Sequence, residues 1–233
     1  MNEKERIDLS NNNQIITKYG STAPSFYMGV VGIYHLVGTL PLGRVGVGPV
    51  FYMRKLRTIE MKRLTVDEFR EADKLPLVVV LDDVRSMHNV GSVFRTGDAF
   101  RIEAVYLCGI SPMPPAAEIH KTALGAEDSV EWRHFDTATE AVRELQQRGY
   151  TVYAIEQAEG STMLHEMRYD PTTRYAIVMG NEVKGVHQEV IDIADGCIEI
   201  PQYGTKHSMN VSVTAGIVMY EFAMGNQKTS QRG

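Results

Sequence analysis

The sequence predicts an α/β domain of three layers, in which a mostly parallel sheet lies between two layers of helices. Two observations predict it. Apolar runs rich in β-branched residues, such as LVVVL at 77–81, are typical of strands buried on both faces of a parallel sheet. These runs alternate with segments of helical period, at the spacing of strand–helix units. We therefore expect one α/β domain rather than a series of small ones.

The composition is that of a globular protein and narrows the classes of function. The chain has 233 residues, of which 43% are hydrophobic and 23% charged, and its net charge is −5. Proteins that bind nucleic acid through bulk charge are basic, so only a local basic patch fits here. The two cysteines, Cys108 and Cys197, form no metal-binding cluster. We expect no metal site and a reduced, cytoplasmic compartment.

Residues 1–52 differ from the rest of the chain and are expected to be a poorly ordered extension. The segment 42–50 repeats glycines without helical or strand period. The uncharged segment 26–42 has glycines, His35 and Pro41 and is short for a membrane span, so we expect no membrane insertion. A sharper hypothesis is that Met53 is the true start and that residues 1–52 lie upstream of it.

Residues 53–76 are expected to form a basic arm with a short helix. From Arg54 to Lys74 the chain has seven Lys or Arg residues against five acids. Thr65 and Glu68 have the spacing of a capping box, which predicts a helix from there to about Lys74. Most of these charges are expected on a solvated face. The alternative is an arm that contacts phosphates.

The elements of the domain, residues 77–225, are predicted in order from apolar period and breakers. Strands are expected over 77–81, 104–107, 129–135, 151–155 and 175–179. Helices are expected over 89–100, where Asn89 acts as the cap, and over 138–148 and 187–194, with a short helical piece within 112–124. After a short strand that stops at Pro201, a polar loop leads to a last helix.

That last helix is expected to begin at residues 208–210 and to end at Gly225. Ser208 and Asn210 are residue types that accept hydrogen bonds from a first helical turn. Val211, Ala215, Val218 and Phe222 recur at helical spacing. Glycine commonly follows the end of a helix, so residues 226–233 are expected to be a disordered tail.

Three polar segments stand out as candidate binding elements. In the first, Asn89–Phe100, Arg95 lies near a helix N-terminus, against the preference of the helix dipole, which suggests a phosphate or carboxylate partner. The alternative is a surface arginine paired with Asp98 or Asp82. Without GxGxxG or Walker spacing, this segment does not indicate nucleotide-phosphate binding of those types.

The second and third segments are a turn and a loop that follow strands. In the turn, Gly180 permits close approach of the backbone, and Glu182 could orient a hydroxyl or offset a cationic ligand. The third segment, 198–225, is a polar strand–helix junction of the kind at which α/β proteins bind ligands. The alternatives without a binding function are a solvated turn for the second segment and an ordinary connection before a docking helix for the third.

Taken together, the three segments resemble the motifs of the SpoU (TrmH-like) family of RNA ribose 2′-O-methyltransferases, in the SPOUT superfamily. The resemblance covers about residues 77–225. Met209 stands where the family usually has Leu, and Arg101 where it often has Gly. The matching residues are Asn89, Gly91, Arg95 and Thr96 in the first motif, Gly180, Asn181, Glu182 and Gly185 in the second, and Ile200, Pro201, Ser208, Asn210, Val211 and Ser212 in the third.

The resemblance implies a fold, a cofactor and a set of roles. It implies a SPOUT-type α/β knot, whose C-terminal segment is threaded into a deep trefoil knot, and S-adenosylmethionine (SAM) bound between the second and third motifs. The cofactor would contact Gly180, Ile200 and Met209. Arg95 would hold the target phosphate and stabilise the developing 2′-alkoxide, since a guanidinium is a poor base. Further catalytic-site residues, orienting RNA or cofactor, would be Asn89, Glu182, Ser208 and Asn210.

The same resemblance implies a homodimer that methylates tRNA or rRNA. Three other interpretations remain open. The chain could be an RNA-binding homologue that no longer methylates, or a knotted methyltransferase that acts on a substrate other than RNA. It could also be a plain α/β interaction module, which would bind no cofactor.

Overall fold

The computed structural model describes residues 53–230. The chain divides into one unit up to Lys55 and a second from Leu56 onward, and the helices and strands described below lie in the second. Residues 1–52 lie outside the described residues. Three expectations therefore fall outside them as well: the poorly ordered extension, the start at Met53 and the absence of membrane insertion by segment 26–42. No described helix is long and apolar enough to cross a membrane.

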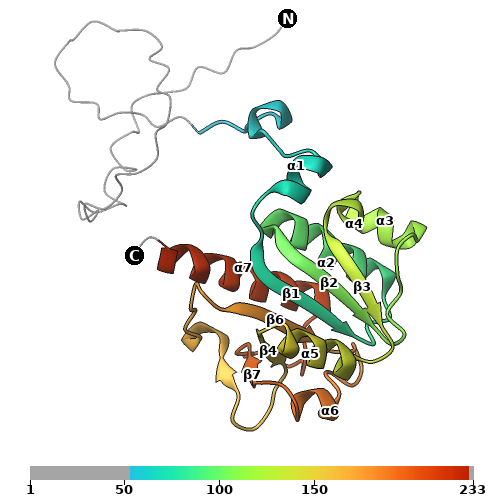
Figure 1. Ribbon diagram of the computed structural model, residues 1–233, viewed down its shortest axis with the longest axis vertical. Helices are drawn as coiled ribbons and strands as arrows, with labels where there is room; N and C mark the ends of the chain where they lie inside the picture. Colours follow the sequence, from blue (N-terminus) through green and yellow to red (C-terminus); the bar gives the residue numbers. More distant parts are fainter. Residues whose placement is uncertain (1–52, 231–233) are drawn as a thin grey trace, which may run out of the picture. The chain divides into compact units, whose positions relative to one another are not determined.

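A seven-stranded sheet, parallel at every pairing, forms the middle of the domain (Figure 1). The order of its strands is β3-β2-β1-β6-β4-β7-β5. This confirms the expected α/β class with a parallel sheet. The strands are β1 (Leu75–Asp82), β2 (Ile102–Cys108), β3 (Glu131–Phe135), β4 (Tyr150–Ile155), β5 (Thr162–Met163), β6 (Arg174–Met179) and β7 (Gly196–Glu199).

Helices cover both faces of the sheet, as expected for three layers. On one face lie α1 (Val66–Glu71), α2 (Met87–Phe100), α3 (Ala117–Ala123), α4 (Ala126–Ser129) and α7 (Val211–Ser230). On the other lie α5 (Ala138–Gln147) and α6 (Gln188–Ile191), in front of the sheet in Figure 1. Alternate residues of β1 point to the two sides: Val79 packs in the first core and Val80 in the second. Both faces of this strand are buried, which explains its continuous apolar run.

The predicted elements are present, with differences at some ends. The third strand begins at Glu131 rather than Ser129, because Ser129 is the last residue of α4. Four short elements were not predicted: α4, β5 and the 3₁₀ turns η3 (Thr58–Met61) and η4 (Leu164–Glu166). Each is too short to show a hydrophobic period. The capping box of α1 is confirmed, because the backbone N–H of Thr65 donates to Glu68 Oε2 at 2.8 Å and that of Glu68 donates to Thr65 Oγ1 at 3.3 Å.

The prediction that Asn89 caps the helix after β1 is wrong. Helix α2 begins at Met87, and its N-cap is Ser86, whose hydroxyl accepts the backbone N–H of Asn89 at 3.2 Å. The Asn89 side chain is therefore available for other contacts. At the far end of α2, Arg101 adopts the left-handed conformation with φ of 51°, the geometry that glycine takes most easily. The helix thus ends in the usual way although Arg101 stands where the family often has Gly.

The prediction that Gly225 ends the last helix is also wrong. Helix α7 continues to Ser230, so residues 226–230 are helical rather than a disordered tail, and residues 231–233 lie outside the described residues. A glycine is needed within the helix because the ring of Tyr169 lies against it. A Cβ at position 225 would come within 2.1 Å of that ring. The trefoil knot that the resemblance implies stays a prediction.

Gly225 and Gly216 make a matched pair for testing this packing. Alanine is favoured over glycine inside a helix by about 1 kcal/mol. At Gly216 a Cβ would meet Thr96 Cγ2 at 3.8 Å, an ordinary contact, so Gly216→Ala should leave the free energy of unfolding unchanged or raise it. Gly225→Ala should lower it by about 1–3 kcal/mol because Tyr169 must move. Denaturant unfolding of both variants at one protein concentration checks this, and equal stabilisation by the two substitutions would contradict the packing.

Candidate functional site

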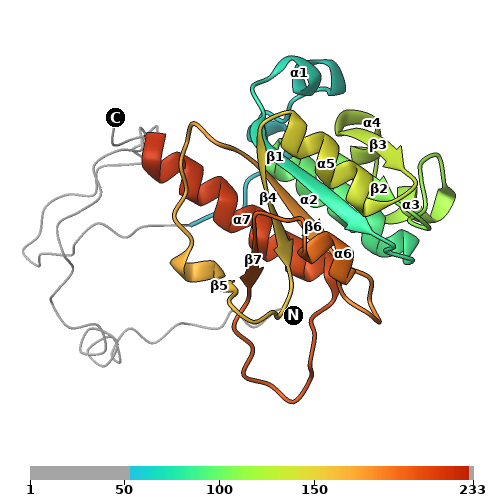
Figure 2. The same cartoon turned by 60° about the horizontal axis from the view of Figure 1, so that its bottom comes forward.

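A cavity of about 310 Å³ opens at the carboxyl ends of β4, β6 and β7. This volume is within the range of small-molecule sites in proteins. Its wall brings together Gly180, Ile200 and Met209, the three residues expected to contact the cofactor, with Glu182 and Ser208. Figure 2 shows the loop between β7 and α7, which supplies part of the wall, extending away from the sheet. The wall is formed by residues 155–157, 179–185, 198–200, 202, 207–209, 211 and 214.

The turn after β6 forms one side of the cavity and is folded tightly on itself. Asn181 and Gly185 exchange two backbone hydrogen bonds, of 3.0 and 2.9 Å. A Cβ at Gly180 would lie 2.0 Å from the backbone carbon of Gly185, so no larger residue fits without a shift of the turn. The side chain of Asn181 holds the turn in place: its amide donates to the backbone oxygen of Asp83 at 3.0 Å, and its oxygen accepts the N–H of Val183 at 2.8 Å.

The side-chain amide of Asn89 joins all three sequence motifs. Its Nδ2 donates to Glu182 Oε1 at 3.0 Å. Its Oδ1 accepts from Asn210 Nδ2 at 3.1 Å and lies 3.5 Å from Ser212 Oγ. A residue of α2 therefore connects the turn after β6 with the start of α7. None of these contacts follows from sequence spacing, since Asn89 is 93 residues from Glu182 and 121 residues from Asn210.

Asn210 has a second contact that fixes the start of α7. Its Oδ1 accepts the backbone N–H of Ser212 at 2.9 Å and the Ser212 hydroxyl at 2.7 Å. This confirms that Asn210 opens the last helix, whereas the expectation that Ser208 also accepts hydrogen bonds from the first turn is wrong. Ser208 lies earlier in the loop, where it is exposed and contributes to the cavity wall.

The carboxylate of Glu182 is held by three donors from other parts of the chain. Besides the Asn89 amide, the backbone N–H groups of Arg85 and Ser86 donate to it at 3.3 and 3.4 Å. Burial acts to raise the pKa of Glu182, but hydrogen bonds from its own backbone, from Asn89 and from these two N–H groups outweigh burial and lower it. The side chain is therefore a carboxylate at neutral pH.

Arg95 is not brought into the cavity wall. It is exposed on α2 and makes no hydrogen bond or ion pair with any residue in the described range 53–230. Neither of the two surface partners considered from the sequence is used: Asp98 accepts the hydroxyl of Ser129 at 3.1 Å, and Asp82 binds His187. The guanidinium of Arg95 is thus available for a ligand outside the cavity of its own chain.

Sequence reasoning missed two carboxylates of the wall, Glu156 and Glu199. Glu156 directly follows β4 and accepts the backbone N–H of Val186 at 3.0 Å, and Glu199 is the last residue of β7. Their positions at strand ends are a signal, because carboxyl ends of parallel strands meet at one edge of a sheet. With Glu182 they give the wall three acidic side chains, whereas its basic side chains are two, Lys184 and His207. Together with apolar residues such as Ile200, this wall suits a ligand that is partly apolar and cationic.

Glu182→Gln tests the contact between the first two motifs. The substitution replaces an acceptor oxygen with a donor that faces other donors, so the free energy of unfolding at pH 7 should fall by about 1 kcal/mol. Because the pKa of Glu182 is lowered on folding, its stabilisation is present above the ordinary value of 4.5 and is lost as the pH falls below it. The stability difference between wild type and variant should therefore shrink in acid. Unfolding curves over this pH range check it, and a difference that is constant with pH would contradict it.

Known proteins with similar sequences are methyltransferases of RNA. The tRNA (guanosine(18)-2′-O)-methyltransferase of Thermus thermophilus is 32% identical over 162 residues, which are 70% of this chain and 81% of that enzyme. The 23S rRNA (guanosine-2′-O-)-methyltransferase RlmB of Neisseria meningitidis is 32% identical and matches over 66% of this chain and 61% of its own length.

Solved structures with the same fold include enzymes that modify tRNA or rRNA. The TrmH/SpoU tRNA modifying enzyme of Aquifex aeolicus superposes with a TM-score of 0.63 at 29% identity, over 71% of this chain and 84% of that one. An rRNA methyltransferase of Sinorhizobium meliloti, solved with AdoMet (SAM) bound, gives a TM-score of 0.61 at 26% identity, over 67% of this chain and 59% of its own. A sequence model of the SpoU rRNA Methylase family matches residues 76–220. The chain therefore belongs to the SpoU rRNA methylase family.

Proposed function

We propose that this protein transfers a methyl group from SAM to a ribose 2′-hydroxyl of structured RNA, either tRNA or rRNA, and that it does so in the cytoplasm. The observation that carries the proposal is the arrangement of the three motifs: the second and third line one cavity, and Asn89 of the first contacts both of them. Membership of the SpoU family and the named activities of the relatives support it.

The cavity fits the chemistry of SAM. SAM has a positive sulfonium and a positive ammonium against one carboxylate, so it is a net cation with an apolar adenine. The wall offers Glu156, Glu182 and Glu199 to the positive groups. Ile200 and Met209 supply apolar surface for the adenine, and Gly180 lets the backbone of the turn approach closely. When bound, SAM supplies an electrophilic methyl group.

The residues of the chain would position the acceptor and stabilise its charge. The acceptor is the 2′-oxygen of RNA, which becomes more nucleophilic as its proton leaves. A guanidinium is a poor base, so Arg95 serves as a hydrogen-bond donor to a phosphate and to the developing alkoxide. Asn89, Glu182, Ser208 and Asn210 orient the two substrates. The requirement for a 2′-hydroxyl restricts the reaction to RNA.

The active form in this proposal is a homodimer that pairs through α2 and α7. Three exposed apolar side chains follow one stripe of α7: Val213 is 54% exposed, Ile217 37% and Tyr220 51%. Such a stripe is typical of a helix that packs against a partner. Arg95 lies outside its own cavity wall, beside Thr96, whose Cγ2 is close to Gly216 of α7. In this proposal, a second copy on this face brings each Arg95 to the cavity of the other.

Transfer of labelled methyl from SAM to total RNA tests the proposed function. The label should become acid-insoluble, be released by ribonuclease, and appear after alkaline hydrolysis in dinucleotides, because a methylated 2′-oxygen cannot attack the neighbouring phosphate. Label in protein or small molecules would favour the methyltransferase with another substrate. SAM binding without methyl transfer would favour the RNA-binding homologue. Absence of SAM binding would favour the plain interaction module.

Arg95→Ala should keep SAM binding and lose at least about tenfold in the rate of methyl transfer, since the guanidinium acts on the RNA and not in the cavity wall. The matched control is Arg143→Ala, which removes an exposed arginine from α5 on the opposite face of the sheet. Calorimetric titration with SAM and single-turnover transfer measure the two effects. Unchanged turnover of the Arg95 variant would refute its assigned role.

Mixing variants tests whether Arg95 serves the partner's cavity. Arg95→Ala should be combined with a variant whose cavity wall is disrupted, such as Ile200→Arg. At limiting SAM, each alone is expected to have at most about a tenth of wild-type activity. The mixture should recover about a quarter, because half of the chains form mixed dimers and each mixed dimer has one complete site. A mixture that stays inactive while mixed dimers form would show that Arg95 acts in its own chain.

A further inference from the structure

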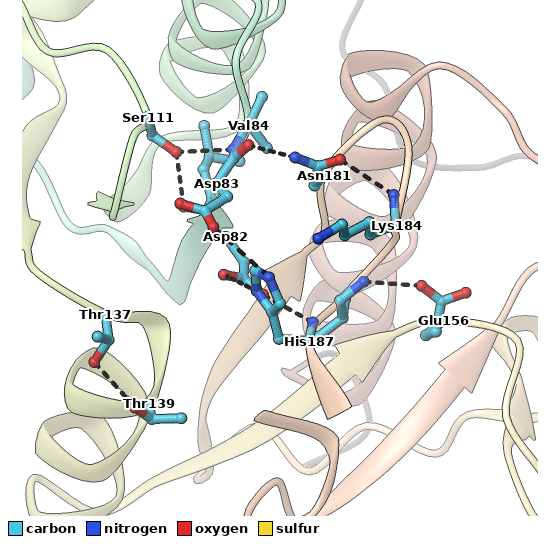
Figure 3. Close-up of polar contacts among 12 residues, drawn as sticks. Asp82, Asp83, Val84, Ser111, Thr137, Thr139, Glu156, Asn181, Lys184 and His187 are labelled. Carbon is cyan, nitrogen blue, oxygen red and sulfur yellow. Dashed lines mark hydrogen bonds and ion pairs between the residues drawn. The ribbon is translucent and has the colours of Figure 1, made fainter. Parts of the chain in front are cut away.

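A cluster of charged side chains lies beside the cavity at the end of β1 (Figure 3). Asp82 is only 3% exposed. The ring Nδ1 of His187 is 2.9 Å from each oxygen of its carboxylate, and the backbone N–H of His187 donates to Asp82 Oδ2 at 3.0 Å. The other ring nitrogen, Nε2, lies 3.7 Å from Asp83 Oδ2. One imidazole thus lies between two carboxylates.

His187 is the partner that makes burial of Asp82 favourable. A buried carboxylate is costly unless it is paired and hydrogen-bonded. Within residues 53–230, the side-chain oxygens of Asp82 accept hydrogen bonds only from the ring and the backbone N–H of His187. When the ring is protonated, both of its nitrogens are donors, so it can bind both carboxylates at once.

The same histidine ends the turn that forms the cavity wall. Residues 180–185 line the cavity, and His187 follows them by two positions. The turn is attached to the rest of the domain at three points. These are Asn181 to the backbone of Asp83, the backbone of Val186 to Glu156, and His187 to Asp82. The backbone hydrogen bond of the third point does not depend on the ring, but the ring contacts to Asp82 and Asp83 are strengthened by the charge of the imidazole. Weakening of these ring contacts would loosen the wall without removing any residue from it.

We infer that His187 is a positioning residue: its protonated ring, held by Asp82 and Asp83, fixes the turn at 180–185, so that cofactor binding weakens when the ring loses its proton. The inference rests on the proposed function, because it takes SAM as the ligand of the cavity. None of the three sequence motifs includes His187 or Asp82, and no role for either followed from the family resemblance.

The direction of the pH dependence follows from the groups around the ring. The hydrogen bond to Asp82 and the charges of Asp82 and Asp83 raise the pKa of His187, while burial and the charge of Lys184 oppose this rise. A histidine whose pKa is raised on folding contributes fully below its ordinary value of 6.5, and this contribution is lost as the pH rises through the folded pKa. Affinity for SAM should therefore fall as the pH rises above 6.5 and passes through the folded pKa of His187.

Calorimetric titration with SAM from about pH 6 to about pH 9 tests this. In the wild type, the Kd should rise about threefold as His187 loses its proton, the size expected for a partly exposed ion pair. His187→Gln keeps a donor without a charge, so its Kd should be raised at low pH and should lack this step. His120→Gln is the matched control, because His120 also pairs with a carboxylate, Glu127 at 2.6 Å, but lies on α3 away from the wall.

A second variant keeps the test valid if His187→Gln folds poorly. Asp83→Asn retains an oxygen to accept the backbone N–H of Ile110 but removes one negative charge next to the ring. It should move the step in Kd, and the NMR titration of the His187 ring, to lower pH together. If either variant showed the same dependence of Kd on pH as the wild type, the inference would be overturned while the proposed function stayed intact. If the wild type bound no SAM at any pH, the proposed function would fail, and this inference with it.

Discussion

The arrangement of the site depends on the side-chain amide of Asn89. An amide offers a donor and an acceptor on separate atoms at its end without carrying a charge, and both are used: the donor goes to Glu182 and the acceptor to Asn210. Since Ser86 caps α2, the Asn89 side chain is released for this purpose. Replacing the amide with a carboxylate would set like charges against Glu182, and replacing it with an apolar group would leave both partners unsatisfied.

The parallel sheet makes this convergence possible. All of its strands end at the same edge, so the segments after β1, β4, β6 and β7 meet although they are distant in the chain. The turn after β6 is then held by groups at the ends of its neighbours, Asp82 of β1 and Glu156 after β4. The cavity wall is therefore as rigid as the contacts between these strand ends, and a charge that titrates there acts on the cofactor site.

Much of this could be predicted from the sequence, and the failures have physical reasons. The buried strands were predictable because both of their faces require apolar residues, and the last helix from its apolar stripe. The end of that helix was not, since Gly225 is there to accommodate Tyr169 and not to stop the helix. Gly180, Ile200 and Met209 lie together in the cavity wall, and their contact with the cofactor stays a prediction. The position of Arg95 outside the wall and the contact of Asp82 with His187 depend on tertiary packing. Sequence spacing has no information about either.

The central claim is that the cavity between the turn at 180–185 and the loop before α7 binds SAM. The most direct test is a calorimetric titration with SAM at neutral pH, on the wild type and on Ile200→Arg, which introduces a long cation into the apolar part of the wall. The account predicts saturable binding of about one SAM per chain to the wild type and, for a variant whose circular dichroism is unchanged, loss of at least about tenfold in affinity. Absence of binding to the wild type, or equal affinity in a folded variant, would contradict it.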